Sequence, residues 1–227
     1  APRGWTAPER RLWMQVRTGR WLDLGGRLKR GNGPDRPEQT VGTGVSPRPP
    51  GESARARLRF DLPRRFVVYV GRIDPGKGIN ELFHDHRRYR DGGGDVELVL
   101  VGRRPEGVSV PSWVRTLGFV TDQERSDVLA AADALVMPSV NESLSLVLLE
   151  AWQQSRPTLA TARNAVVVGQ TQRSGGGLIY ADASEYARQL RVLSANPDVA
   201  TALGAAGARW VGELTWDRAV ARWEALF

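Results

Sequence analysis

Residues 66–78 read FVVYVGRIDPGKG and decide the fold of this chain. Phe66–Val70 is a continuous apolar run, which is typical of a strand buried on both faces of a parallel sheet. Three glycines lie in the eight residues that follow, and a helical pattern then continues from Gly78 to about Arg90. Strand, glycine-rich turn and helix in this order indicate the start of a βαβ unit.

The same alternation continues to the end of the chain. Further strands are expected at residues 96–101, 114–117, 134–137, 158–160 and 178–180. Helices are expected at 121–132, 146–154, 163–174 and 182–194, followed by two more. This spacing fits βαβ crossovers. The sequence therefore predicts an α/β fold, with a Rossmann-like doubly wound parallel sheet over residues 61–227.

Residues 1–60 differ from the rest of the chain. A capping-box pattern at residues 6–9 predicts a short helix to about residue 16, and residues 19–51 are broken by glycine and proline as in a linker. The segment holds 13 basic and 5 acidic side chains, a net charge of +8, whereas residues 61–227 have a net charge of −1. We interpret residues 1–60 as a partly irregular basic segment that precedes the folded domain.

Composition excludes several classes of site. The 227-residue chain has no cysteine, so disulfides, thiolate metal sites and a cysteine nucleophile are excluded. With two histidines and scattered acids, no metal site is predicted.

The net charge of +7 lies in the basic segment, so it gives the domain no reason to bind nucleic acid. An acidic partner, an anionic membrane surface and solubility remain alternative roles for that segment. No apolar run spans a bilayer, and a cytoplasmic location, with a peripheral position at the inner membrane face as an alternative, is expected.

The turn at residues 71–78 is the first candidate site. Ligands of open α/β sheets bind beyond the carboxyl ends of the strands, and glycines there let the backbone approach a phosphate. Arg72 offers a forked donor and Lys77 a mobile positive charge, which together suit a diphosphate. The spacing matches neither a Walker motif nor a dinucleotide fingerprint. A strand–helix turn with two solvated cations is the alternative.

The stretch Pro138–Glu150, PSVNESLSLVLLE, is the second candidate site. Ser143 or Ser145 can cap the helix that follows, which would leave its first amides for an anionic ligand. Glu142 lies in the loop, and Glu150 lies in an apolar stretch about two turns further on. The helical pattern alone favours a solvent-facing Glu150. We expect His84 and His86 to be solvated and to face different directions, which excludes chelation.

Taken together, these stretches resemble the C-terminal, nucleotide-sugar-binding half of a family 4 retaining glycosyltransferase of the GT-B fold. The resemblance covers roughly residues 64–227. The segments that carry it are VYVGRIDPGKG, ELVLVG, LGFV, DALVMPSVNESLSLVLLEAW and RPTLAT. It implies transfer of a sugar from a nucleoside-diphosphate sugar to an unknown acceptor, with retention of configuration. A non-catalytic sugar-nucleotide-binding module, a GT-B-like sugar-nucleotide epimerase and a basic nucleic-acid-binding domain are the alternatives.

The resemblance also implies roles for single residues. The implied catalytic groups are Arg72 and Lys77, which hold and neutralise the leaving diphosphate, and Glu142, which faces the transferred sugar. Glu150 would accept hydrogen bonds from the ribose. The remaining donor-binding residues are those of the first turn, the nucleobase wall and the helix start, whose amides face phosphate or sugar: Gly71, Phe119, Val120, Leu144, Ser145 and Leu146. No cofactor and no obligatory metal are implied.

The sequence departs from the family pattern at two places. Serines stand at 143 and 145, where the family has glycines around the first glutamate. Residues 162–165 replace a glycine pair that commonly follows the RPTLAT-type strand. The acceptor site of a GT-B enzyme lies on a separate N-terminal domain, and residues 1–60 are too short to form one. We therefore expect a remnant of that domain, and little turnover by this chain alone.

Overall fold

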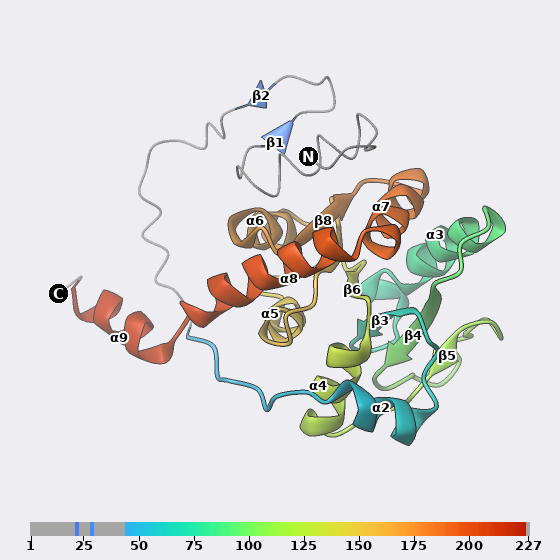
Figure 1. Cartoon of the computed structure of the whole chain (residues 1–227), viewed down its shortest axis with the longest axis horizontal. Helices are drawn as coiled ribbons and strands as arrows, with labels where there is room; N and C mark the ends of the chain where they lie inside the picture. Colours follow the sequence, from blue (N-terminus) through green and yellow to red (C-terminus); the bar gives the residue numbers. More distant parts are fainter. Residues whose placement is uncertain (1–20, 23–27, 30–43, 226–227) are drawn as a thin grey trace. The chain divides into compact units, whose positions relative to one another are not determined.

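The structure is a computed structural model that describes residues 21–22, 28–29 and 44–225 (Figure 1). The chain divides into two compact units, one of residues 1–46 with 213–227 and the other of Pro47–Gly212. The helix expected at residues 6–16 lies outside the described residues. In the smaller unit, β1 (Trp21–Leu22) pairs antiparallel with β2 (Leu28–Lys29), and α9 (Trp216–Glu224) is an amphipathic helix.

The larger unit is built on a six-stranded sheet in which every pairing is parallel. The strand order is β5-β4-β3-β6-β7-β8. Their bounds are β3 Phe66–Val70, β4 Glu97–Val101, β5 Arg115–Thr116, β6 Ala134–Met137, β7 Thr158–Thr161 and β8 Gly177–Tyr180. The predicted Rossmann-like doubly wound parallel sheet is thus confirmed.

The order in which the chain adds strands to the sheet reverses between β3 and β6. From β3 the chain moves outward to β4 and β5, and then returns to place β6 on the other side of β3. At such a switch point the loops that follow the two central strands diverge and leave a crevice for a ligand. The loops concerned are the turn at residues 71–78 and the stretch that begins at Pro138, the two candidate sites of the sequence.

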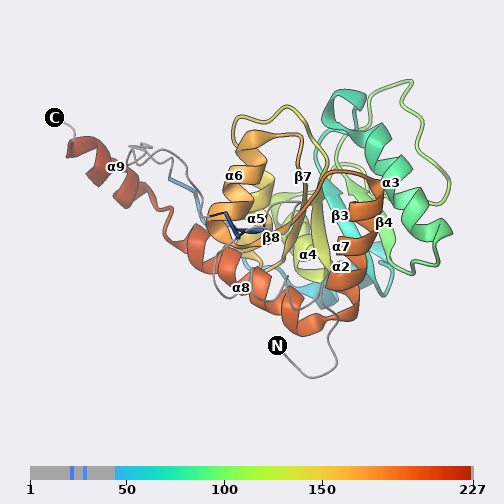
Figure 2. The ribbon, with the colours of Figure 1, turned by 90° about the horizontal axis from the view of Figure 1, so that it is seen from above.

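Helices cover both faces of the sheet (Figure 2). Right-handed crossovers place the helix that leads to β4 on one face and the helices that lead to β7 and β8 on the other. Helix α7 returns to pack against α3, and α8 contacts α5, α6 and α7. The bounds are α3 Ile79–Asp91, α4 Asp122–Ala131, α5 Leu146–Gln153, α6 Ala165–Ser174, α7 Ala183–Ala195 and α8 Pro197–Gly212.

Trp152 anchors α5 in the core. Its side chain is fully buried, and its Nε1 donates a hydrogen bond to the carbonyl oxygen of Gly176 at 2.8 Å. A Cβ on Gly207 of α8 would lie 2.3 Å from the Trp152 ring, so only glycine permits this approach of the two helices. Burial of one large aromatic side chain contributes about 3 kcal/mol or more to stability, which fixes the helix that carries Glu150.

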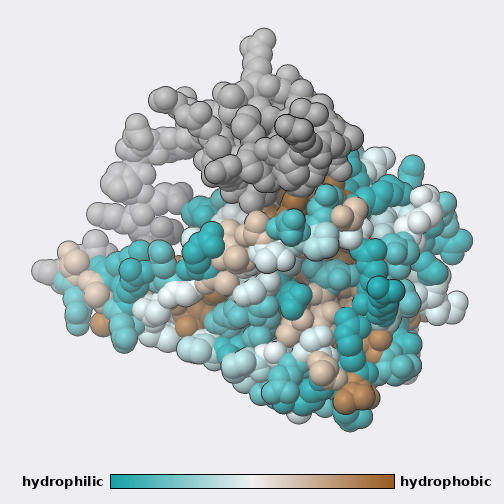
Figure 3. All heavy atoms as spheres, in the orientation of Figure 1, coloured by the Kyte–Doolittle hydropathy of each residue, from teal (hydrophilic) through white to brown (hydrophobic). Residues whose placement is uncertain are grey.

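Helix α2 (Ser53–Phe60) corrects the expectation that residues 1–60 stand apart from the domain. It packs against α4, and the compact unit therefore begins at Pro47 rather than at residue 61. The helix lacks an apolar stripe: Ala56 is its one buried residue, and Leu58 is 89% exposed. Figure 3 shows that the surface of the described part of the molecule is a mixture of hydrophilic and hydrophobic areas. Arg55 instead holds it to the buried carboxylate of Asp127, at 2.5 and 2.6 Å, and this contact lowers the pKa of Asp127.

Candidate functional site

The carboxyl ends of β3, β4 and β5 are tied together by backbone contacts. The Gly71 N–H donates to the Val101 carbonyl at 2.9 Å, and the Gly102 N–H donates to the Gly118 carbonyl at 2.8 Å. Gly102 has a φ of +136°, and a Cβ there would lie 1.9 Å from the carbonyl oxygen of Gly71. The close approach of these two turns therefore requires glycine, and it gives the candidate site a rigid backbone floor.

Lys77 and Glu142 meet across the switch point. Lys77 Nζ lies 2.9 Å from Glu142 Oε1, and the two side chains are 33% and 17% exposed. The approach depends on Gly78, whose φ is +75° and whose hypothetical Cβ would lie 2.4 Å from the carbonyl oxygen of Pro138. One ion pair thus joins the two predicted site segments at the switch point of the sheet. Burial of the Tyr69 hydroxyl, and secondarily the charge of Glu142, raise the pKa of Tyr69.

Arg72 lies in the same turn and remains accessible. Its side chain is 62% exposed, and its Nε lies 3.3 Å from Asp74 Oδ2. Asp74 also shapes the turn, because its Oδ1 accepts a hydrogen bond from the Gly76 N–H at 2.8 Å and so caps the short 3-10 helix η1 (Pro75–Lys77). One turn therefore carries two partly exposed cations, Arg72 and Lys77. Among the described residues, no group of three or more His, Cys, Asp or Glu side chains could hold a metal ion.

An apolar cavity of about 300 Å³ adjoins this turn. Phe119 is 73% exposed, Val120 is buried, and the Arg103 guanidinium lies 5.4 Å from the centre of the Phe119 ring. The cavity is lined by Val70, Gly71, Arg72, Val101, Gly102, Arg103, Phe119, Val120 and Arg125. Four residues predicted to bind the donor therefore share one cavity: Gly71, Arg72, Phe119 and Val120.

Glu150 is 6% exposed, so the solvent-facing position favoured by the helical pattern is wrong. Two arginines compensate its charge. Glu150 Oε1 accepts from Arg48 Nη2 at 2.6 Å and from Arg125 Nη2 at 3.2 Å. Arg125 Nε lies 3.0 Å from Oε2 without donating to it, and this buried oxygen has no hydrogen-bond partner among the described residues. Since Arg125 also lines the apolar cavity, it joins that cavity to Glu150.

The start of α5 is arranged differently from the expectation. Ser145 occupies the N-cap position, but its hydroxyl makes no capping hydrogen bond, and its N–H donates to Gln170 Oε1 at 3.2 Å. Of the three amides expected to face phosphate or sugar, the Ser145 amide is therefore engaged by the protein. The flanking Leu144 and Leu146 side chains are 36% and 53% exposed.

Asn164 holds the Glu142 loop, a role that the sequence did not suggest. Its Oδ1 caps α6 by accepting from the Val167 N–H at 3.0 Å. Its Nδ2 donates to the carbonyl oxygens of Val140 at 2.9 Å and of Glu142 at 3.3 Å. The turn that replaces the expected glycine pair thus fixes the backbone beside Glu142. The capping of α6 has a signal in the sequence, an Asn directly before an apolar run, whereas the contacts with the Glu142 loop have none.

His86 corrects a second expectation. It is fully buried rather than solvated, with Nδ1 2.8 Å from the Tyr186 hydroxyl and Nε2 3.1 Å from the Val96 carbonyl oxygen. Burial lowers its pKa to about 4, so the imidazole is neutral at pH 7. His84 is exposed and contacts Asp85, which confirms that the two histidines face different directions. His86 is therefore a core residue.

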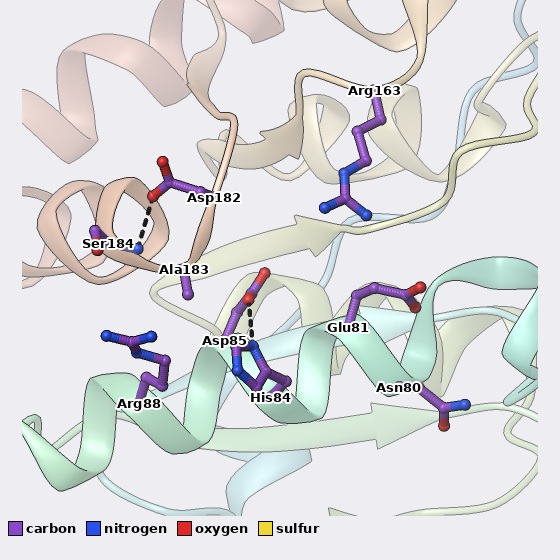
Figure 4. Close-up of a pocket in the computed structure, with 9 residues that line it drawn as sticks. All are labelled: Asn80, Glu81, His84, Asp85, Arg88, Arg163, Asp182, Ala183 and Ser184. Carbon is purple, nitrogen blue, oxygen red and sulfur yellow. Dashed lines mark hydrogen bonds and ion pairs between the residues drawn. The ribbon is translucent and has the colours of Figure 1, made fainter.

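A second cavity, of about 480 Å³, lies between α3 and the start of α7 (Figure 4). Charged side chains of both signs line it, with Glu81 and Asp85 on α3 and Arg163 on the turn after β7. Asp182 already caps α7 through the N–H groups of Ser184 and Glu185. None of the predicted donor-binding residues lines this cavity, so we separate it from the candidate site.

The structure thus brings the predicted residues into two adjoining groups, the Lys77–Glu142 pair and the cavity, with Glu150 connected through Arg125. Sequence reasoning missed Arg48 and Arg125. Arg125 lies one turn after the capping box at Thr121, and its position on α4 directs it to α5. Arg48 lies among prolines in the linker-like stretch, where no periodic pattern predicts a contact.

Comparison with known proteins adds family evidence to this geometry. A family model described as "Glycosyl transferases group 1" matches residues 64–196. The D-inositol 3-phosphate glycosyltransferase of Streptomyces coelicolor is 31% identical over 192 residues, which cover 74% of this chain and 41% of that protein. The chain thus spans less than half the length of this relative, and it matches its C-terminal part.

Solved structures agree with the fold. Sucrose-phosphate synthase from Thermosynechococcus elongatus superposes with a TM-score of 0.68 at 25% identity, covering 81% of this chain and 50% of that chain. Anabaena HepE in complex with UDP and glucose superposes with a TM-score of 0.62 at 17% identity, covering 76% of this chain and 50% of that chain. The sheet is therefore that of the C-terminal half of a GT-B fold.

Proposed function

This chain belongs to the family of glycosyl transferases group 1, and on that premise we propose that its crevice binds the nucleoside-diphosphate part of a sugar donor. One observation carries the proposal: a cationic turn, an apolar cavity and a buried carboxylate adjoin one another at the switch point of the sheet. These are the three environments that a diphosphate, a nucleobase and a ribose require. The structure of HepE with UDP supports a nucleoside diphosphate as the ligand class.

In this proposal each group has one task. Arg72 and Lys77 bind the diphosphate, and their charges stabilise it as it leaves the sugar. Phe119 and Val120 form the wall of the nucleobase cavity. Glu150, the buried carboxylate joined to the cavity through Arg125, accepts hydrogen bonds from ribose hydroxyls. Glu142 lies in the loop held by Asn164, and in this proposal its carboxylate faces the transferred sugar.

The reaction that follows is transfer of the sugar to an acceptor, with retention of configuration and without an obligatory metal. The acceptor-binding half lies outside this chain, supplied in cis or in trans, and the chain alone therefore binds the donor with little turnover. A non-catalytic sugar-nucleotide-binding module is a second candidate. The engagement of the Ser145 amide by Gln170 favours it, because that amide is then withheld from the donor.

The location of the protein belongs to the same proposal. Among the described residues, no helix is both long and apolar enough to cross a membrane. We place the enzyme in the cytoplasm, where nucleotide sugars are its substrates, with the basic residues that precede Pro47 at the anionic inner face of the membrane. Sedimentation with vesicles of anionic and of zwitterionic lipids tests this part, because electrostatic binding to the anionic vesicles is weakened by salt.

The test of the proposed function is a thermal-shift screen of the full chain with UDP, GDP, ADP and dTDP and their sugars. A ligand present at about 100 times its dissociation constant stabilises the folded state by about 2.7 kcal/mol. We expect at least one nucleotide to raise the melting temperature in the unsubstituted chain and not in Lys77→Met. Equal shifts in both proteins would reject the phosphate site.

A further inference from the structure

Arg48 belongs to a segment that the rest of the domain holds in place. Its N–H donates to Gln153 Oε1 at 3.1 Å, and the Gly51 N–H donates to Gln154 Oε1 at 2.8 Å. Gln154 Nε2 in turn donates to the Pro49 carbonyl oxygen at 3.2 Å. These bonds fix the backbone of residues 48–51 along the end of α5, the helix that carries Glu150.

From this position the Arg48 side chain reaches the carboxylate proposed to bind the ribose. Arg48 Nη2 donates to Glu150 Oε1 at 2.6 Å, and Nη1 donates to Asp122 Oδ2 at 2.9 Å. Glu150 Oε1 already accepts two hydrogen bonds, and Oε2 has less than 1 Å² of exposed surface. A ribose hydroxyl therefore finds no accessible acceptor on Glu150 while Arg48 is in place.

We propose that Arg48 is a latch that competes with the donor ribose for Glu150. The proposal rests on the proposed function, because it needs Glu150 to be the ribose acceptor. Binding of the nucleotide breaks the Arg48–Glu150 bond and opens the carboxylate to the ribose hydroxyls. Breaking that bond costs free energy, which reduces the net binding free energy of the nucleotide, so the latch weakens donor binding.

The contacts of the two arginines favour Arg48 as the group that moves. Both arginines also contact Asp122, whose side chain is 63% exposed, so this second partner does not distinguish them. Arg125 contacts both carboxylate oxygens of Glu150 and lines the apolar cavity, so its displacement would disturb the nucleobase wall. Arg48 is thus released at the lower cost, with its backbone unchanged.

The test is isothermal titration of the full chain with UDP, GDP and ADP. We expect Arg48→Ala and Arg48→Gln to bind the preferred nucleotide about tenfold more tightly than the unsubstituted chain, which corresponds to about 1.4 kcal/mol. In a Glu150→Gln background, Arg48→Ala should give no gain, because the acceptor for which Arg48 competes is altered. That background separates competition for Glu150 from a general effect of removing one positive charge.

Arg55→Ala is the matched control. Arg55 also joins the start of the domain to a buried carboxylate, Asp127, but it does not contact Glu150. It should lower stability and leave nucleotide affinity unchanged. Equal or weaker binding by both Arg48 variants overturns the latch while the proposed function stands. Binding of no nucleotide by either the unsubstituted chain or the variants overturns both.

Discussion

Lys77 Nζ and Glu142 Oε1 lie 2.9 Å apart across the switch point of the sheet. The pair joins a cation from the turn after β3 to a carboxylate from the loop after β6, so two segments separated by 65 positions in the chain form one site. In the absence of a donor, each charge neutralises the other. A diphosphate would therefore take Lys77 from Glu142 and leave the carboxylate free to face the sugar.

The first prediction is that removing one or the other charge of this pair changes diphosphate affinity in opposite directions. Lys77→Met removes the cation and should abolish measurable binding of nucleoside diphosphates. Glu142→Gln keeps the size of the side chain and releases Lys77, so diphosphate affinity should rise by up to about fivefold, since a partly exposed pair contributes at most about 1 kcal/mol. Titration calorimetry of both variants measures the effect. Weaker diphosphate binding by Glu142→Gln would show that the glutamate does not compete for Lys77.

The exposed ring of Phe119 provides the second prediction. Because it forms a wall of the apolar cavity, Phe119→Ala should weaken nucleotide binding by about 1–3 kcal/mol, the range for a base stacked on an aromatic side chain. Folding should be unaffected, since the ring is 73% exposed. Leu58→Ala is the control, because it also removes an exposed apolar side chain but Leu58 does not line the cavity. Unchanged affinity in Phe119→Ala would remove this cavity from the site.

The backbone floor of the site gives the third prediction. Gly102→Ala places a Cβ 1.9 Å from the Gly71 carbonyl oxygen, in a backbone conformation with φ +136°, and should cost about 3 kcal/mol or more of unfolding free energy. Gly107→Ala is the matched control. Gly107 also has a positive φ, +79°, but nothing lies within 4 Å of a Cβ placed there, so this substitution should cost about 1–2 kcal/mol of unfolding free energy. Urea denaturation compares the two, and equal losses would disprove the close approach at Gly102.

The buried histidine gives the fourth prediction. The folded-state pKa of His86 is about 4, below the value of 6.5 for an unperturbed imidazole. Between pH 6.5 and 4 the unfolded chain therefore binds the additional proton, and stability falls as the pH falls, by up to about 1.4 kcal/mol per pH unit. His86→Gln should lose this slope. Urea denaturation at pH 7, 6 and 5 checks it, and identical slopes in the two proteins would place the imidazole in solvent.

The sheet could be predicted from the sequence because its strands are short apolar runs at βαβ spacing. Each of the two candidate segments also lies where such a sheet binds ligands, after β3 and after β6. Helix α2 could not be predicted, because arginine contacts rather than an apolar stripe hold it. His86 and Glu150 share a different reason: their burial depends on partners distant in sequence, Tyr186 and Arg48, which no local pattern contains.

The central claim is that the turn at residues 71–78 binds the diphosphate of a nucleotide. The most direct measurement is calorimetric titration of the full chain with UDP, GDP, ADP and dTDP, each paired with its free nucleoside. We predict that one diphosphate binds much more tightly than its nucleoside in the unsubstituted chain, and that this difference disappears in Lys77→Met. Equal binding of diphosphate and nucleoside, or a difference that survives in Lys77→Met, would contradict the account.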